Sequence, residues 1–251
     1  MEWKLSKLVS FNDVDTLIPL ALIVLNAPLR ITSTFEALWK RASVTLFADG
    51  GANRVYDALG DDELRKRYLP STIVGDLDSL RPDVRDWYAQ KKITAQEDHD
   101  QNSTDFQKCL AVIDTDPNVS SSACVVAVGA LSGRFDHVMH AINVLHLSPA
   151  NRPLYLLSDE SVAFLLRPGK HTIICDTRME GPTCGLLPIG APVAHITSTG
   201  LKWNLDSSLP TKFGGLVSTS NAFADEPASK SERVVTVDTD GAVVWTCELR
   251  S

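Results

Sequence analysis

The chain has 251 residues, and its 44% hydrophobic content is enough for the core of one large domain or of two domains of ordinary size. With 31 acidic against 24 basic residues the formal net charge is −7, and no lysine- or arginine-rich run offers a surface for nucleic acid or an anionic membrane. We therefore expect a globular protein that acts on a small molecule, with no nucleic acid or membrane partner.

The first apolar run, residues 17–25, is too short to span a bilayer. It contains Pro19 and follows Asp13 and Asp15, where a signal peptide would carry positive charge, so we interpret it as a buried strand. The five cysteines include no CxxC pair and are odd in number, which argues against a disulfide framework or a zinc site and favours a reducing compartment. The sequence thus predicts a cytoplasmic location.

Up to about residue 150, short apolar runs alternate with amphipathic helical patterns. In chain order the runs are 20–25, 44–48, 71–74, 92–96 and 125–128. Runs that are apolar throughout, each followed by a helix, are typical of a parallel sheet covered on both faces. Residues 1–150 are therefore predicted to form a doubly wound α/β domain with a mainly parallel sheet.

After residues 148–153 the helical periodicity stops, and β-rich segments separated by turns take over. Asp240-Gly241 lies between two alternating runs, which is a hairpin signal. Residues 151–251 are predicted to form an all-β sandwich, in which the polar insert 224–232 is interpreted as a mobile loop.

Polar residues gather where the apolar runs of the α/β domain end. Because ligands of open α/β sheets bind outside the carboxyl ends of the strands, these turns are the first place to look for a site. Four successive turns carry unusual chemistry, at 49–53, 75–79, 97–105 and 129–136.

One of these turns has two aspartates at a spacing that suggests a cation. In extended backbone Asp76 and Asp78 share a face, and their like charges repel unless a cation lies between them. The turns offer oxygen ligands and no histidine or cysteine at ligand spacing, which favours Mg²⁺ before Ca²⁺. The alternative is that Asp76, Asp78 and Ser79 are loop residues that cap the helix starting near Pro82.

Two features of these turns suit a phosphate, namely glycines that let the backbone approach a ligand closely and Arg134. Arg134 lies near the start of a predicted helix, where an anion held by both the guanidinium and the helix dipole would explain a cation at that position. The alternative is an arginine that is exposed or paired with Asp136. Thr104 and Gln107 fit a capping box that puts Asp105 in the first helical turn, and a capped helix is also a rigid mount for a metal carboxylate.

Other signals point less directly to function. His137 and His140, three apart on a predicted helix, are interpreted as core or surface histidines because no third metal ligand is in view. Trp203 follows Lys202 in a predicted loop, where the indole could stack on a cationic or aromatic ligand, with core packing as the alternative. The chain has no P-loop, and no GxGxxG follows its first predicted strand, so neither motif supports nucleotide binding here.

Six segments resemble, in their order and approximate spacing, those of the thiamine pyrophosphokinase (thiamine diphosphokinase) family, and the eukaryotic type in particular. They are ADGGANRVYD, GDLDSLRPDV, DQNSTDFQKCL, GRFDHVMHAINVL, GLKWNLD and LVSTSN, within a resemblance that covers residues 17–249. It implies a Rossmann-like α/β domain followed by a β-sandwich, and transfer of a pyrophosphoryl group from ATP to thiamine, giving thiamine diphosphate and AMP. It also implies Mg²⁺ and a homodimer with sites at the subunit interface.

The resemblance implies roles at the matching positions. The metal ligands would be Asp76, Asp78 and Asp105. The ATP-binding residues would be Asp49, Asn53, Thr104 and Arg134. The thiamine-binding residues would be Gln101, Trp203, Ser220 and Asn221, with the tryptophan reaching the metal site of the partner subunit. Arg134 would offset charge on the transferred group together with the metal, and Asp100 is the candidate acceptor of the hydroxyl proton.

Two other functions share some of these features. The segment GDLDS resembles the DxD nucleophile motif of haloacid dehalogenase phosphatases, which would form a covalent phosphate on Asp76. That motif normally follows the first strand, whereas here it follows the third. A non-catalytic binding module with the same fold would keep the thiamine pocket and make no product, and the complete acidic set argues against it.

Overall fold

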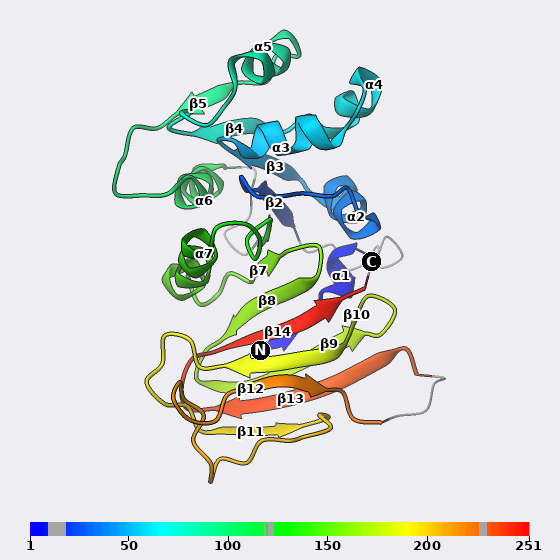
Figure 1. Ribbon diagram of the computed structural model, residues 1–251, viewed down its shortest axis with the longest axis vertical. Coiled ribbons are helices and arrows are strands. Elements are labelled where there is room, and N and C mark those ends of the chain that lie inside the picture. The colour runs from blue at the N-terminus through cyan, green and yellow to red at the C-terminus, as the bar shows by residue number, and fades with distance from the viewer. Residues whose placement is uncertain (10–18, 118, 120–122, 226–229, 251) are drawn as a thin grey trace. The chain divides into compact units, whose positions relative to one another are not determined.

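The computed structural model describes residues 1–9, 19–117, 119, 123–225 and 230–250 (Figure 1). By its internal contacts the chain divides into two compact units, one of Asp13–Asp159 and the other of Met1–Asn12 with Glu160–Ser251. We call them the α/β unit and the β unit. Among the described helices, none has the length and apolar character needed to cross a membrane.

The α/β unit is built on a parallel sheet in the order β7-β6-β2-β3-β4-β5. Its strands are β2 (Leu20–Val24), β3 (Val44–Ala48), β4 (Thr72–Gly75), β5 (Ala95–Glu97), β6 (Cys124–Val128) and β7 (Leu154–Leu157). No residue of β2 is more than 1% exposed, as expected for a central strand covered on both faces.

Helices cover both faces of this sheet. They are α2 (Ser33–Arg41), α3 (Gly51–Ala58), α4 (Asp62–Arg65), a 3₁₀ turn (Lys66–Tyr68), α5 (Pro82–Gln90), α6 (Asp105–Thr115) and α7 (Phe135–Leu147). Figure 1 shows α2 and α3 on one side of the sheet and α6 and α7 on the other. The prediction of a doubly wound α/β domain is confirmed.

The strand order reverses next to β2. The chain runs outward from β2 through β3 and β4 to β5, and then returns through α6 to β6, which pairs with the opposite edge of β2. A reversal of this kind leaves a crevice at the carboxyl ends of the two central strands, because the loops that follow them lead to opposite sides.

The β unit consists of two sheets, in the orders β1-β9-β13-β11 and β12-β10-β14-β8. Its elements are β1 (Glu2–Trp3), α1 (Ser6–Val9), β8 (Ser161–Leu166), β9 (Gly169–Asp176), β10 (Glu180–Leu187), β11 (Ile196–Thr199), β12 (Ser218–Ala222), β13 (Glu232–Thr239) and β14 (Val243–Leu249). The ring of Trp3 from one sheet stacks on Phe164 from the other, with centroids 4.2 Å apart. The predicted β-sandwich is confirmed.

Two details of the β unit differ from expectation. The N-terminal strand β1 pairs in parallel with β9, so residues assigned by sequence to the α/β domain belong to this unit. The hairpin predicted at Asp240-Gly241 is wrong, because β13 pairs with β9 and β11 whereas β14 pairs with β8 and β10. The turn instead carries the chain from one sheet to the other, and the carboxylate of Asp240 accepts a hydrogen bond from the amide of His195 at 2.7 Å. Residues 226–229 of the predicted loop 224–232 lie outside the described residues.

Candidate active site

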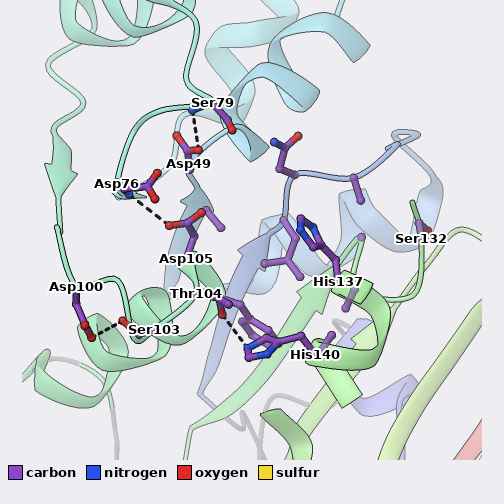
Figure 2. Close-up of a pocket in the computed structure, with 18 of the residues that line it drawn as sticks. Asp49, Asp76, Ser79, Asp100, Ser103, Thr104, Asp105, Ser132, His137 and His140 are labelled. Carbon is purple, nitrogen blue, oxygen red and sulfur yellow. Dashed lines mark hydrogen bonds between the residues drawn. The ribbon is translucent and has the colours of Figure 1, made fainter. Parts of the chain in front are cut away.

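Three carboxylates meet at the carboxyl ends of β3 and β4 and the start of α6. Asp49, Asp76 and Asp105 each offer an oxygen, and these oxygens all lie within 4.8 Å of one another. Figure 2 shows the three side chains directed toward one another. We call this group the aspartate cluster. The three strand-end turns that supply it were all singled out from the sequence.

Asp49 is the most buried member of the cluster. It follows β3 with a φ of 43°, in the left-handed region, and its amide donates to the carbonyl of Val74 at 2.9 Å. Its Oδ2 atom accepts a hydrogen bond from the amide of Ser79 at 3.0 Å, whereas Oδ1 is buried with no hydrogen-bond partner among the described residues. Burial raises the pKa of Asp49, and the nearby charge of Asp105 raises it further.

Asp105 occupies the first turn of α6, behind the predicted capping box of Thr104 and Gln107, which is present. Its Oδ1 atom accepts a hydrogen bond from the amide of Asp76 at 3.3 Å. Burial raises the pKa of Asp105, as does the charge of Asp76. Two carboxyl groups of the cluster therefore favour protonation more than an exposed aspartate would, first because they are buried and then because they lie beside another carboxylate.

A glycine allows the cluster to be this compact. A Cβ atom on Gly75, the last residue of β4, would lie 2.7 Å from the Cβ of Asp49 and 3.0 Å from Oδ1 of Asp105. Real Cβ atoms essentially never approach a neighbour more closely than 3.0 Å. Any other residue at this position would push the two aspartates away.

The cluster forms one wall of a cavity of about 340 Å³. The cavity is lined by residues that follow β2, β3, β4, β5 and β6, and by His137 and His140 of α7. Its position at the strand-order reversal is the one expected for a ligand site in an open α/β sheet. The predicted site residues that line it are Asp49, Asp76, Asp100, Gln101, Thr104 and Asp105.

Three predicted residues of the α/β unit do not line this cavity. Asp78 is exposed and lies outside the aspartate cluster, with Oδ1 accepting from the hydroxyl of Ser79 at 2.9 Å. Asn53 holds the loop after β4, because its amide donates to the carbonyl of Ser79 at 2.7 Å and accepts from the amide of Arg81 at 3.2 Å. Arg134 pairs with Asp136 at 2.5 Å, which is the alternative considered from the sequence.

Sequence reasoning missed functional candidates on α6 and α7. His140 lines the cavity, and its Nε2 atom lies 3.0 Å from the hydroxyl of Thr104. His137 lines the cavity as well. Lys108 is buried beside the cluster, with its ammonium 3.4 Å from Oδ1 of Asp105. The sequence signal for Lys108 was its position three residues after Asp105 on a predicted helix, since residues at i and i+3 share a face.

Family models match both units. The model for the catalytic domain of thiamin pyrophosphokinase matches residues 35–156, and the model for its vitamin B1 binding domain matches residues 170–244. A curated relative, thiamine pyrophosphokinase 3 of Oryza sativa subsp. japonica, is 48% identical over 242 residues, which is 92% of this chain and 87% of the relative. The chain belongs to the thiamin pyrophosphokinase family.

More distant thiamin pyrophosphokinases agree with this assignment. The enzyme of Saccharomyces cerevisiae is 30% identical, over 82% of this chain and 79% of its own length. The crystal structure of yeast thiamin pyrophosphokinase superposes with a TM-score of 0.85 at 28% identity, covering 99% of this chain and 91% of that one. Thiamin pyrophosphokinase from Candida albicans, at 23% identity and a TM-score of 0.81 over 99% and 93% of the two chains, shows the shared fold.

The match to the vitamin B1 binding domain of thiamin pyrophosphokinase contains the three site residues predicted in the β unit. Trp203 is 57% exposed, so its indole is not a core side chain. The side-chain amide of the buried Asn221 donates to the carbonyl of Trp203 at 2.8 Å, and its oxygen accepts from the Trp203 amide at 3.3 Å. Asn221 thus fixes the backbone that presents the indole. Ser220 is exposed, with a φ of 55°.

Proposed function

We propose that this chain transfers a pyrophosphoryl group from ATP to the hydroxyl of thiamine, giving thiamine diphosphate and AMP. The observation that carries the proposal is the aspartate cluster, which forms one wall of the cavity at the strand-order reversal, within the part of the chain that matches the family's catalytic domain. A group of buried and half-buried carboxylates beside a cavity is suited to a cation that accompanies phosphates.

The residues of the cluster fit Mg²⁺. Oδ1 of Asp49 is buried and lacks a hydrogen-bond partner among the described residues, so it has a lone pair free for a ligand. The donor set is made only of carboxylate oxygens, which are the ligands that hard divalent cations prefer. Asp49, Asp76 and Asp105 would hold the ion, and Asp78 on the adjoining loop remains a predicted further ligand. When bound, Mg²⁺ supplies positive charge that offsets the charge of the phosphates.

The chain's own residues would bind and orient ATP. The hydroxyl of Thr104, held by His140, lines the cavity at the N-terminus of α6, where the helix dipole favours a phosphate oxygen. Arg134 is exposed and pairs with its neighbour Asp136, so its guanidinium could exchange that carboxylate for a phosphate at little cost. Asn53 would act on ATP through the loop it holds.

Asp100 and Gln101 line the same cavity and are proposed to face thiamine. Hydrogen bonds from the Ser103 hydroxyl and the Asn102 amide lower the pKa of Asp100, so its carboxyl is ionised but is a weaker base than an ordinary aspartate. An ionised carboxylate can accept a hydrogen bond from the thiamine hydroxyl and then its proton, which is the role proposed for it. In-line transfer otherwise depends on positioning and charge, because little covalent chemistry is required of the protein.

In the β unit, Trp203 is proposed to bind the cationic thiazolium ring of thiamine. The ammonium of Lys202 lies 5.0 Å from the centre of the Trp203 ring, so this indole face is already accessible to a cation. Ser220 and Asn221 are proposed to complete the vitamin site.

We also propose that the enzyme is a homodimer in which Trp203 of one subunit serves the aspartate cluster of the other. Mixing Asp76→Asn protein, which lacks a carboxylate of the cluster, with impaired Trp203→Ala protein should then restore activity, since one site in a mixed dimer has both intact halves. No recovery in demonstrably mixed dimers would contradict this arrangement. A cytoplasmic location is proposed as well, supported by five cysteines that are all buried and free.

The deciding experiment is incubation with thiamine, ATP and Mg²⁺, followed by chromatography of the products. AMP and thiamine diphosphate in equal amounts are expected. ADP as the sole nucleotide product would contradict pyrophosphoryl transfer. A phosphoaspartate trapped on Asp76 would instead favour the phosphatase mechanism, and absence of turnover with intact thiamine binding would favour a binding module.

A further inference from the structure

A lysine is buried behind the aspartate cluster. Lys108 extends from α6 one turn after Asp105, and its side chain is only 2% exposed. Its ammonium lies 3.4 Å from Oδ1 of Asp105 and 4.0 Å from Oδ2 of Asp76. Lysine is almost never buried to this degree unless it is paired, so these two carboxylates explain its position.

Lys108 is not among the residues that line the cavity. It therefore approaches the carboxylates from the protein side, while ATP and thiamine would approach from the cavity side. We therefore expect Lys108 to act on bound ligands through the aspartates and through its electric field.

The Lys108 ammonium changes the net charge of the aspartate cluster. Three ionised carboxylates carry −3, and the ammonium reduces the sum to −2, which one divalent cation neutralises. Without the ammonium, the site would attract a cation more strongly and repel the phosphates of ATP more strongly. Because the ammonium of Lys108 is buried, its electrostatic effects on the cation and on the phosphates are screened less than they would be at the surface.

We propose that Lys108, whose ammonium lies beside Asp76 and Asp105, serves as a fixed internal countercharge that weakens cation binding at the aspartate cluster and strengthens ATP binding. This inference rests on the proposed function, which assigns the metal to the aspartate cluster. A lysine with a purely structural role would affect both ligands in the same direction.

The test compares Lys108→Met, which keeps the length of the side chain and removes its charge, with Lys108→Arg, which keeps the charge. Lys40→Met is the matched control, because the Lys40 side chain is 64% exposed and pairs with Glu36 at 3.9 Å on α2. Mn²⁺ binding to the nucleotide-free protein is measured by the electron paramagnetic resonance of free Mn²⁺. ATP binding is measured by calorimetry in EDTA, and folding by thermal melting.

In Lys108→Met we expect the Mn²⁺ dissociation constant to fall about tenfold and the ATP dissociation constant to rise about tenfold, the effect of a nearby unit charge. Lys108→Arg should return both constants toward those of the wild type, and Lys40→Met should change neither. Weakened binding of both ligands, or no change in either, would overturn the proposal.

Two further outcomes are informative. If Lys108→Met does not fold, Lys108→Gln, which keeps a hydrogen-bond donor for Asp105, provides the same comparison. If the wild-type protein binds no Mn²⁺, the metal assignment itself fails and the countercharge proposal fails with it. Mn²⁺ binding to the wild type that Lys108→Met leaves unaltered overturns the countercharge alone.

Discussion

Gly75 and Asp49 lie so close together that a Cβ atom on the glycine would be 2.7 Å from the Cβ of the aspartate. We predict that Gly75→Ala displaces Asp49 and Asp105, lowers turnover more than tenfold and raises the Mg²⁺ concentration needed for half-maximal rate. Overpacking should also cost about 1–3 kcal/mol of stability. The measurements are steady-state kinetics against Mg²⁺ and denaturant unfolding. Gly60→Ala is the matched control, because no atom lies within 4 Å of a Cβ there.

Asp49→Asn should separate the function of the cluster from its stability. The pKa of Asp49 is raised in the fold, so its contribution to stability is complete below its unfolded pKa and is lost as the pH rises through the higher folded value. Asparagine does not ionise, so the variant does not lose this stability as the pH rises. We expect the metal-free variant to melt at a higher temperature than the wild type at pH 8, with a smaller difference near pH 4, while turnover falls by about 100-fold or more. Asp86→Asn, on the exposed face of α5, should change neither quantity.

Asp78 provides a test of the predicted ligand set. It lies outside the cluster in the described structure, and it is exposed. If it is a ligand in the working enzyme, Asp78→Asn should lower turnover by about 100-fold while the melting temperature without metal stays unchanged. Normal turnover at limiting Mg²⁺ would restrict the ligand set to Asp49, Asp76 and Asp105.

Trp203→Ala should weaken thiamine binding about tenfold or more, because a desolvated cation–π contact contributes about 1–2 kcal/mol. ATP binding should change little. The melting temperature of Trp203→Ala should equal that of the wild type, since the indole is 57% exposed. Trp203→Phe, which retains a weaker aromatic face, should give an intermediate affinity. An equal loss of affinity for ATP and thiamine, measured by calorimetry, would speak against a specific thiamine contact.

Glu180 makes the β unit sensitive to pH. Burial raises the pKa of Glu180 to about 7, and its carboxyl lies among the thiols of Cys175 and Cys247. Since the folded pKa is above the unfolded one, the stabilisation is complete below about pH 4.5 and lost as the pH rises through about 7, a difference of about 3 kcal/mol. We expect Glu180→Gln to raise the melting temperature at pH 8 and to leave it unchanged near pH 4.5. Equal melting curves of the two proteins at pH 8 would show that the carboxyl ionises without cost.

The α/β architecture could be predicted because its signals are local. Apart from β5, each strand of this unit is a short apolar run, and each turn that supplies the cluster follows a predicted strand directly. The strand order then brings Asp76 and Asp105 together although they are 29 residues apart. Asp49 was predicted as an ATP-binding residue, and its place within the cluster depends on a left-handed backbone conformation that the sequence does not reveal.

Contacts that depend on distant partners could not be predicted. Trp3 in β1 pairs with Ile173, and a strand of two residues has no periodicity to detect. The hairpin signal at Asp240-Gly241 was local and misleading, since a tight turn can join two strands of different sheets as well as neighbours in one sheet. Lys108 was overlooked because a lysine on an amphipathic helix is usually solvated, and its spacing of three from Asp105 did not show that it is buried against two carboxylates.

The pairing of β1 with β9 also affects the order in which the chain can mature during synthesis. The α/β unit is continuous in sequence, so the pairings among its own strands can form before the rest of the chain is made. The β unit cannot complete its sheets at that stage, because Glu2 and Trp3 pair with Thr172 and Ile173, which are synthesised later. Until then the indole of Trp3, which stacks on Phe164 in the folded protein, remains an exposed apolar surface that promotes aggregation of the nascent chain.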